Sequence, residues 1–245
     1  MSTNNIFDIA INRVCLNNPE FSYDDFGTLY TDAFWKLQYE IYMEEASPDS
    51  LTQEKDYGFI DEIVACLLGG YGLKAEVGWA AYKKLKYHNL IRRGVVSEEV
   101  AAILSEPLNI GGKWIHYRFP LQKSKYISDF LCRDDLDVIP INDDLSFRAW
   151  LLTINGIGPK TASWITRNYL HSDRVAIIDI HLYRAGILTG FINPRLNIHK
   201  DYFEIERCFL DYCESLQVRP SIMDMVMWLN MKNTNRIAIS LINKI

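Results

Sequence analysis

Apolar side chains recur every three to four residues along most of the chain, and few stretches alternate with the period of two that indicates strands. The clearest apolar stripe lies in residues 53–68, and the pair Gly69-Gly70 is a stop signal after it. The pair Gly111-Gly112 predicts an irregular loop. We therefore predict an all-α fold with helices over residues 29–43, 53–68, 73–88, a short stretch N-capped by Ser97, 120–131, a stretch ending at Thr153, a stretch from Pro159, about 202–216 and 222–231.

The most specific local pattern lies in the middle of the chain, where a helix ending at Thr153 and a helix beginning at Pro159 flank the residues Asn155 to Gly158. We expect Gly156 and Gly158 to supply positive φ angles and close backbone approach, with Gly158 as the N-cap of the second helix. Proline suits the first helical position, where no N–H is needed. The N-terminus of the second helix would then offer backbone N–H groups and the positive dipole end to a phosphate.

The residues that follow complete a recognisable signature. The run Leu-x-x-Ile-x-Gly-Ile-Gly-Pro-Lys-Thr-Ala, followed by Ile-Ile-Asp-Ile-His-x-x-Arg, resembles the helix-hairpin-helix, Gly-Pro-Asp signature of the DNA glycosylase superfamily. In lyase-competent members a lysine occupies the position of Lys160 and an aspartate the position of Asp179, about twenty residues later; here they are nineteen positions apart. The segment from Arg118 to Ile127 is similar to a stretch of 8-oxoguanine glycosylases in this superfamily.

This resemblance implies a fold and a domain organisation. In relatives, a helical barrel ends with the helix-hairpin-helix, and the N-terminal segment joins the C-terminal helices in a second lobe, with the extruded base in the cleft between the lobes. Mapped onto this chain, the barrel would span residues 55–172, and residues 1–54 and 173–245 would form the second lobe.

The resemblance also implies a base excision repair enzyme, a DNA glycosylase with AP lyase activity. Lys160 would attack the sugar carbon C1′ and form a Schiff base, and β-elimination would then cleave the strand. A lysine amine attacks only when neutral, and a helix N-terminus disfavours the ammonium form. Asp179 would stabilise positive charge on the sugar and assist proton movement. The alternatives are a surface lysine that contacts a phosphate and an aspartate that only caps a helix.

The expected partner is double-stranded DNA containing a damaged base. The residues expected to contact this DNA are Gly156, Ile157, Gly158, Lys160, Thr161, His181 and Arg184. For the flipped base, Asp224 and Trp228 stand four positions apart on the last helix, as in archaeal-type 8-oxoguanine glycosylases, and would accept from the base edge and stack on the ring. The alternative is that Trp228 belongs to the core. Weaker recognition candidates are Gln38, Trp35 and Gln53, and Tyr71 is a candidate for filling the gap in the duplex.

The composition of the chain bears on its DNA affinity and on its cofactors. The formal net charge of −5 runs against strong non-specific DNA binding, although lysines and arginines cluster around residues 83–93 and 113–125. Five cysteines without a CxxC pair indicate reduced thiols, and only Cys208 and Cys213 follow Asp179, which argues against an iron–sulfur cluster. The scattered histidines lack metal-ligand spacing. We expect no cofactor beyond a monovalent cation on the hairpin backbone.

The chain shows neither a basic segment before an apolar run at its N-terminus nor an apolar run long enough to span a membrane. We therefore expect a monomeric protein that is cytoplasmic, as in a prokaryote, or otherwise intracellular. 8-Oxoguanine is the base that the resemblance favours. Two alternatives stay open: a glycosylase of this superfamily for another damaged or modified base, and a non-catalytic DNA-binding protein built on the same hairpin.

Overall fold

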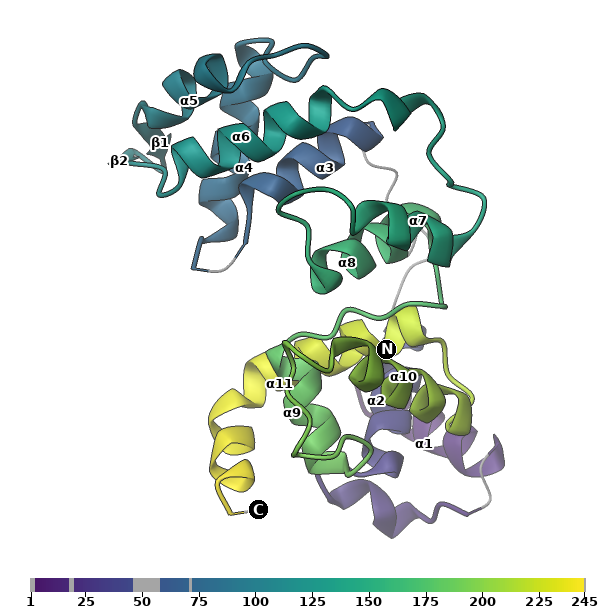
Figure 1. Cartoon of the computed structure of the whole chain (residues 1–245). Helices are drawn as coiled ribbons and strands as arrows, with labels where there is room; N and C mark the ends of the chain where they lie inside the picture. Colours follow the sequence, from purple (N-terminus) through teal and green to yellow (C-terminus); the bar gives the residue numbers. More distant parts are fainter. Residues whose placement is uncertain (1–2, 18–19, 46–57, 71, 245) are drawn as a thin grey trace. The chain divides into compact units, whose positions relative to one another are not determined.

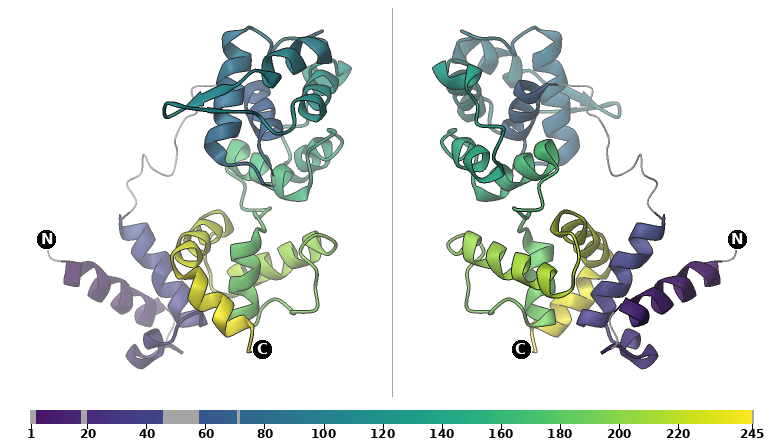
Figure 2. Two further views of the ribbon diagram at one scale, coloured as in Figure 1. Left: turned by 90° about the vertical axis from the view of Figure 1, so that its left-hand side faces the viewer. Right: turned by 90° about the vertical axis from the view of Figure 1, so that its right-hand side faces the viewer.

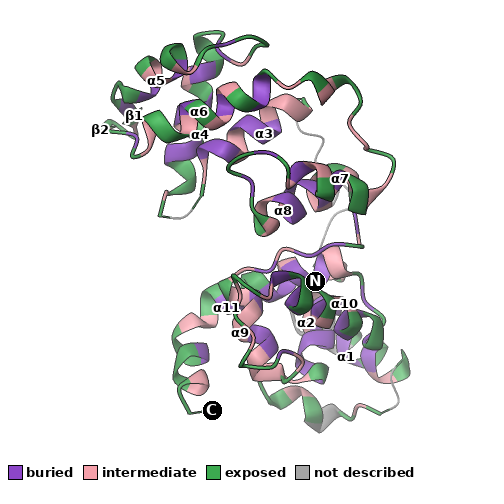
Figure 3. Cartoon of the chain, in the orientation of Figure 1, coloured by how far each residue is buried: buried purple, intermediate pink, exposed green. Residues whose placement is uncertain are grey.

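The computed structural model describes residues 3–17, 20–45, 58–70 and 72–244 (Figure 1). Helices account for most of these residues, which confirms the predicted all-α class. The chain divides into two compact units, one made of residues 1–54 and 171–245 and the other of residues 55–170. In each unit the buried faces of the helices pack against one another and the exposed faces point outward (Figure 3).

The unit of residues 55–170 is a set of helices around one apolar core, which includes Leu67, Leu85, Phe130 and Phe147. Helix α5 packs against α6, and α7 packs against α8. Its elements are α3 (Phe59–Leu68), α4 (Ala75–Tyr87), α5 (Ser97–Ser105), β1 (Leu108–Ile110), β2 (Lys113–Ile115), α6 (Pro120–Leu131), the 3₁₀ helix η3 (Asp134–Asp137), α7 (Asp144–Leu151) and α8 (Pro159–Leu170).

Two local predictions in this unit are wrong. The stretch around Gly111-Gly112 is an antiparallel β-hairpin, with Leu108 opposite Ile115, rather than an irregular loop. Both glycines have positive φ, +57° and +81°, as a tight two-residue hairpin turn requires. Ser97 is the first residue of α5 and Val96 occupies the N-cap, without a side-chain capping bond. The predicted start of α3 at Gln53 lies outside the described residues.

The unit of residues 1–54 and 171–245 has its own core, in which Trp35, Phe209 and Met223 are fully buried. Helix α11 lies along α9 (Figure 2). It continues eleven residues beyond the predicted end at Met231, because neither glycine nor proline interrupts that stretch. The elements are α1 (Thr3–Asn17), η1 (Tyr23–Gly27), α2 (Asp32–Glu45), α9 (Ile180–Thr189), α10 (Tyr202–Ser215) and α11 (Pro220–Ile242).

Within the part of the chain that the structure describes, no helix combines the length and the apolar character that crossing a bilayer demands.

Candidate active site

The turn between α7 and α8 is built by backbone hydrogen bonds and two buried side chains. Helix α7 ends at Leu151, two residues before the predicted end, and the Ile154 amide donates to the Leu151 carbonyl at 3.1 Å. The Ile157 amide donates to the Ile154 carbonyl, also at 3.1 Å. Both isoleucines are nearly buried, at 3% and 6% exposure, and belong to the core of this unit. The packing of these two side chains in the core therefore fixes the position of the turn.

The two glycines of this turn have different roles. Gly156 has a φ of +92°, and a Cβ atom added there would lie 2.4 Å from Cδ2 of Tyr126, so both conformation and space require glycine. Gly158 has no positive φ and no atom within 4 Å of an added Cβ, so the predicted positive φ is wrong for Gly158. Its carbonyl accepts from the Ala162 amide at 2.9 Å, which places it at the N-cap position before Pro159.

The start of α8 has the features of an anion site. Since Ala162 makes the first intrahelical bond, the amides of Lys160 and Thr161 precede the helical ladder and point out of the helix end. Lys160 is exposed in the protein without DNA. Gly156 and Gly158 are also exposed, whereas Ile157 buries its side chain and uses its amide within the turn.

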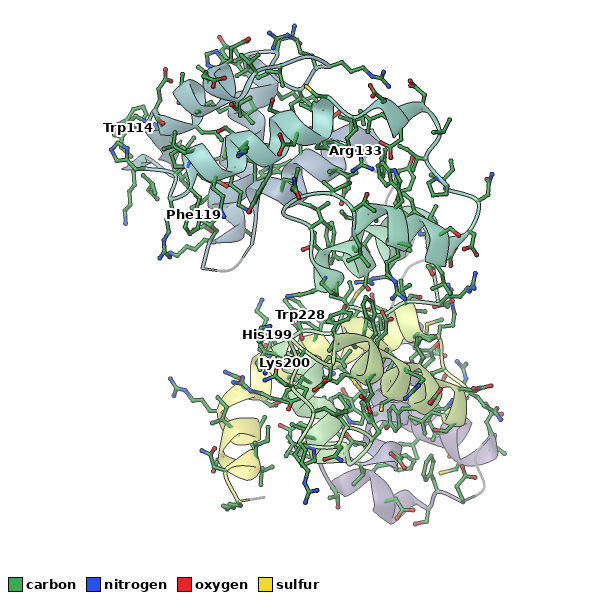
Figure 4. The ribbon with its side chains drawn as sticks, in the orientation of Figure 1. Trp114, Phe119, Arg133, His199, Lys200 and Trp228 are labelled. Carbon is green, nitrogen blue, oxygen red and sulfur yellow. The ribbon has the colours of Figure 1, made fainter. Side chains whose placement is uncertain are left out.

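A polar network that sequence reasoning missed fixes the end of α7. The guanidinium of Arg133 (labelled in Figure 4) donates to both carboxylate oxygens of Asp135, at 2.8 and 2.5 Å, and to Oγ1 of Thr153 at 3.0 Å. The indole of Trp150 donates to the same carboxylate at 2.7 Å. The hydrogen bonds from Arg133, with a smaller contribution from the Trp150 indole, lower the pKa of Asp135 to about 2. The network ties η3 to the residues that enter the turn.

Asp179 is the N-cap of α9. Its Oδ1 accepts from the amides of His181 at 2.8 Å and Leu182 at 2.9 Å, which confirms the predicted cap. Both of these bonds use Oδ1, so the helix cap does not engage the second carboxylate oxygen, Oδ2. Asp179 is half-buried. A carboxylate in this position can cap the helix and also act on a bound group.

His181 and Arg184 lie on the same helix as this cap. His181 is half-buried, and within the described part of the chain its Nδ1 is enclosed without a hydrogen-bond partner. The Arg184 guanidinium donates to Oδ1 of Asn235, on α11, at 2.8 Å. Arg184 is thus tied to α11 in the protein without DNA.

The predicted base-recognition residues differ sharply in exposure. Asp224 is 4% exposed, and its Oδ2 accepts from the Ile177 amide at 3.3 Å. Trp228 (Figure 4) is 38% exposed, with the Lys232 ammonium 4.8 Å from the centre of its ring. The alternative of a core tryptophan is therefore wrong. Although four positions apart, the two residues are not equally accessible.

The base-recognition candidates on α2 differ in burial. Gln38 is half-buried on α2, and Trp35 is fully buried with its indole donating to Oγ1 of Thr189 at 2.8 Å. The prediction that Trp35 contacts a base is wrong, because the core of its own unit encloses the ring. Gln53 and Tyr71 lie outside the described residues.

Two lysines of the basic cluster on α4 are paired with carboxylates. The Lys84 ammonium lies 2.8 Å from Glu106, and the Lys86 ammonium 3.3 Å from Asp61. Among residues 3–17, 20–45, 58–70 and 72–244, no group of three or more His, Cys, Asp or Glu side chains is arranged to hold a metal ion.

The chain is similar to known proteins over most of its length. A family model described as 8-oxoguanine DNA glycosylase matches residues 45–218. The 8-oxoguanine DNA glycosylase/AP lyase of Fusobacterium nucleatum is 30% identical over 180 residues, which cover 68% of this chain and 76% of the relative. The protein of the same name from Metallosphaera sedula is 30% identical over 173 residues, which cover 68% of this chain and 78% of the relative.

Solved structures share the fold. The Methanocaldococcus jannaschii 8-oxoguanine glycosylase/lyase, in complex with a 15mer DNA containing 8-oxoguanine, is 22% identical with a TM-score of 0.53, covering 95% of this chain and 92% of that one. The 8-oxoguanine DNA glycosylase of Thermotoga maritima is 21% identical with a TM-score of 0.52, covering 93% of this chain and 97% of that one.

Proposed function

The chain belongs to the 8-oxoguanine DNA glycosylase family, and we propose that it excises 8-oxoguanine from double-stranded DNA and cleaves the strand at the resulting abasic site. One observation carries the proposal. In a chain of this family, an exposed lysine stands at the N-terminus of α8, directly after a turn that only glycine can make at position 156. This arrangement offers a nucleophile beside a phosphate site, as attack on a nucleotide sugar requires.

The chemistry follows from the two signature residues. Nζ of Lys160 forms a bond to C1′ of the damaged nucleotide while the bond from C1′ to the base breaks. The first product is an aminal at C1′, and Nζ loses a proton. The C1′–O4′ bond then breaks, O4′ takes up a proton and the sugar ring opens to a Schiff base between C1′ and Nζ. The Schiff base acidifies C2′, and loss of a C2′ proton then breaks the C3′–O3′ bond and releases the 3′ phosphate. We assign to the carboxylate of Asp179 the stabilisation of positive charge on the sugar and help with proton movement.

DNA binding would rest chiefly on the backbone. We propose that the amides of Gly158, Lys160 and Thr161, beside Gly156 and Ile157 in the turn, hold one phosphate, and that His181 and Arg184 also contact DNA. The net charge of −5 predicts modest, salt-sensitive affinity for undamaged DNA. A monovalent cation on the turn carbonyls and a monomeric enzyme belong to the same proposal.

For the base, the exposed indole of Trp228 supports a stacking role, since base–aromatic stacking needs an accessible ring face. Asp224 and Gln38 are proposed at the base edge. Asp224 also serves the Ile177 amide, so its two roles need separate variants. Asp224→Asn keeps an acceptor for the amide but changes the pattern offered to a guanine edge, whereas Asp224→Ala removes both.

A panel of duplexes tests the proposal. Purified protein is incubated with duplexes carrying 8-oxoguanine, uracil, thymine glycol or 3-methyladenine, and base release and strand cleavage are measured separately. We expect release and cleavage with 8-oxoguanine, loss of both in Lys160→Gln, and retention of both in Lys83→Gln, which removes an exposed lysine from α4. Activity on a different base would establish the first alternative. Binding without base release on every duplex would establish the non-catalytic one.

A further inference from the structure

The segment that leads into Asp179 is buried but has no regular secondary structure. Val175 and Ala176 are fully buried and Ile178 is 1% exposed, yet residues 175–179 belong to neither helix nor strand. Buried backbone N–H groups need hydrogen-bond partners, and the described residues of this unit contain no strand to provide them. Side chains from elsewhere in the same unit must therefore do so.

Three side chains bind three consecutive amides of this segment. The Ala176 amide donates to Oε1 of Glu206 at 2.9 Å, and the Ile178 amide donates to the hydroxyl of Tyr202 at 3.1 Å. The same hydroxyl donates to the Ala176 carbonyl at 2.9 Å. Between these two amides, the Ile177 amide donates to Oδ2 of Asp224 at 3.3 Å. We call Tyr202, Glu206 and Asp224 the cradle.

The cradle residues are buried side chains of two helices. Tyr202 and Glu206 are one helical turn apart on α10, and Asp224 is on α11; their exposures are 5%, 3% and 4%. The segment is also anchored upstream, where the Asp173 carboxylate accepts from the Ser221 amide at 3.0 Å and from the Arg219 guanidinium at 2.9 Å. The cradle therefore ties the segment to α10 and α11, and the upstream anchor ties it to the start of α11.

Burying two carboxylates to hold two of these three amides is a costly way to fix a loop, because apolar packing would avoid the desolvation of both acids. The residue that follows this segment explains why its backbone is held so firmly. Ile178 is followed directly by Asp179, whose direction depends on the backbone that carries it. In a catalytic site, a displacement of about 1 Å can lower the rate on the order of a hundredfold.

We propose that Tyr202 and Glu206, together with Asp224, are positioning residues: they hold the backbone of residues 176–178 so that the Asp179 carboxylate faces the reacting sugar. This assignment rests on the proposed role of Asp179 in base excision. None of the three needs to touch the sugar, because they act through the main chain.

A coupled set of variants tests the proposal. Single-turnover excision of 8-oxoguanine and the Kd for the same duplex are measured for Tyr202→Phe, alone and combined with Asp179→Asn. We expect Tyr202→Phe to slow excision at least about tenfold with little change in Kd, and to add less than about twofold slowing when Asp179 is already Asn. Glu206→Leu should behave like Tyr202→Phe, and Glu206→Gln, which keeps an acceptor oxygen, should restore the rate to within about threefold.

The matched control is Tyr183→Phe, which removes another tyrosine hydroxyl of this unit, one that donates to the Leu196 carbonyl at 2.6 Å without touching the segment. It should leave excision unchanged. Two results overturn the positioning role and leave the proposed function intact. In the first, Tyr202→Phe excises 8-oxoguanine at the wild-type rate. In the second, Tyr202→Phe slows excision by the same factor whether residue 179 is Asp or Asn. A wild-type protein that releases no 8-oxoguanine overturns the proposed function and the positioning role with it.

Discussion

Gly156→Ala should break the turn before α8 for two reasons that can be separated. A non-glycine residue at a φ of +92° costs about 1–2 kcal/mol. The new Cβ would also lie 2.4 Å from Cδ2 of Tyr126, and forcing a side chain into occupied space costs about 1–3 kcal/mol. Tyr126 cannot swing away without losing the bond that its hydroxyl accepts from Gln122 at 3.0 Å.

The expected total for Gly156→Ala is thus a loss of about 2–5 kcal/mol in the free energy of unfolding. For a chain of this size the midpoint of thermal unfolding should fall by about 5–15 °C, measured by circular dichroism. In a Tyr126→Ala background only the backbone cost remains, so Gly156→Ala should then cost about 1–2 kcal/mol. DNA affinity should fall along with stability, because the turn carries the proposed phosphate site.

Gly158→Ala is the matched control, since that glycine has no positive φ and open space around it. Its cost should stay within about 1 kcal/mol, the difference between glycine and alanine at an N-cap. If Gly156→Ala unfolds at the same temperature as Gly158→Ala, the account of the turn is refuted.

Three further predictions concern single side chains. Asp179→Asn should leave the unfolding midpoint nearly unchanged, because asparagine caps helices as well as aspartate does, while single-turnover excision falls at least about a hundredfold; equal rates would exclude a catalytic carboxylate. Trp228→Ala should slow 8-oxoguanine excision about tenfold or more, since stacking contributes about 1–3 kcal/mol per base, and Trp228→Phe should recover most of the rate. Asp135→Asn should destabilise the fold at pH 7 by about 1 kcal/mol, allowing for its 37% exposed side chain. Because the pKa of Asp135 is held at about 2, below the ordinary 3.8, this difference should persist above pH 4 and vanish in urea titrations as the pH falls through about 2.

Patterns confined to a few neighbouring residues predicted the fold well. Helix α6 begins and ends where the sequence places it, at Pro120 and Leu131, because proline marks the first turn and the apolar spacing is regular. The cap at Asp179 is also local, since it joins residues two and three positions apart. Strands β1 and β2 were missed because three residues are too few to show alternation.

Contacts between distant segments could not be predicted from the sequence. The network of Arg133 with Trp150 and Thr153 joins residues about twenty positions apart, and Asp224 meets an amide 47 positions away. Exposure also depends on tertiary packing, which is why the sequence did not show that Trp35 is fully buried while Trp228 is exposed. The residues of the signature could be identified from the sequence, whereas the side chains that support them required the structure.

In the proposed mechanism the amine of Lys160 forms a covalent bond to the sugar of the damaged nucleotide. Borohydride reduction during incubation with an 8-oxoguanine duplex, followed by mass spectrometry of the peptides, tests it directly. We expect a reduced cross-link on the peptide containing Lys160 and none in Lys160→Gln, which should still bind the duplex. A cross-link at another residue, or excision of 8-oxoguanine without any cross-link, would contradict it.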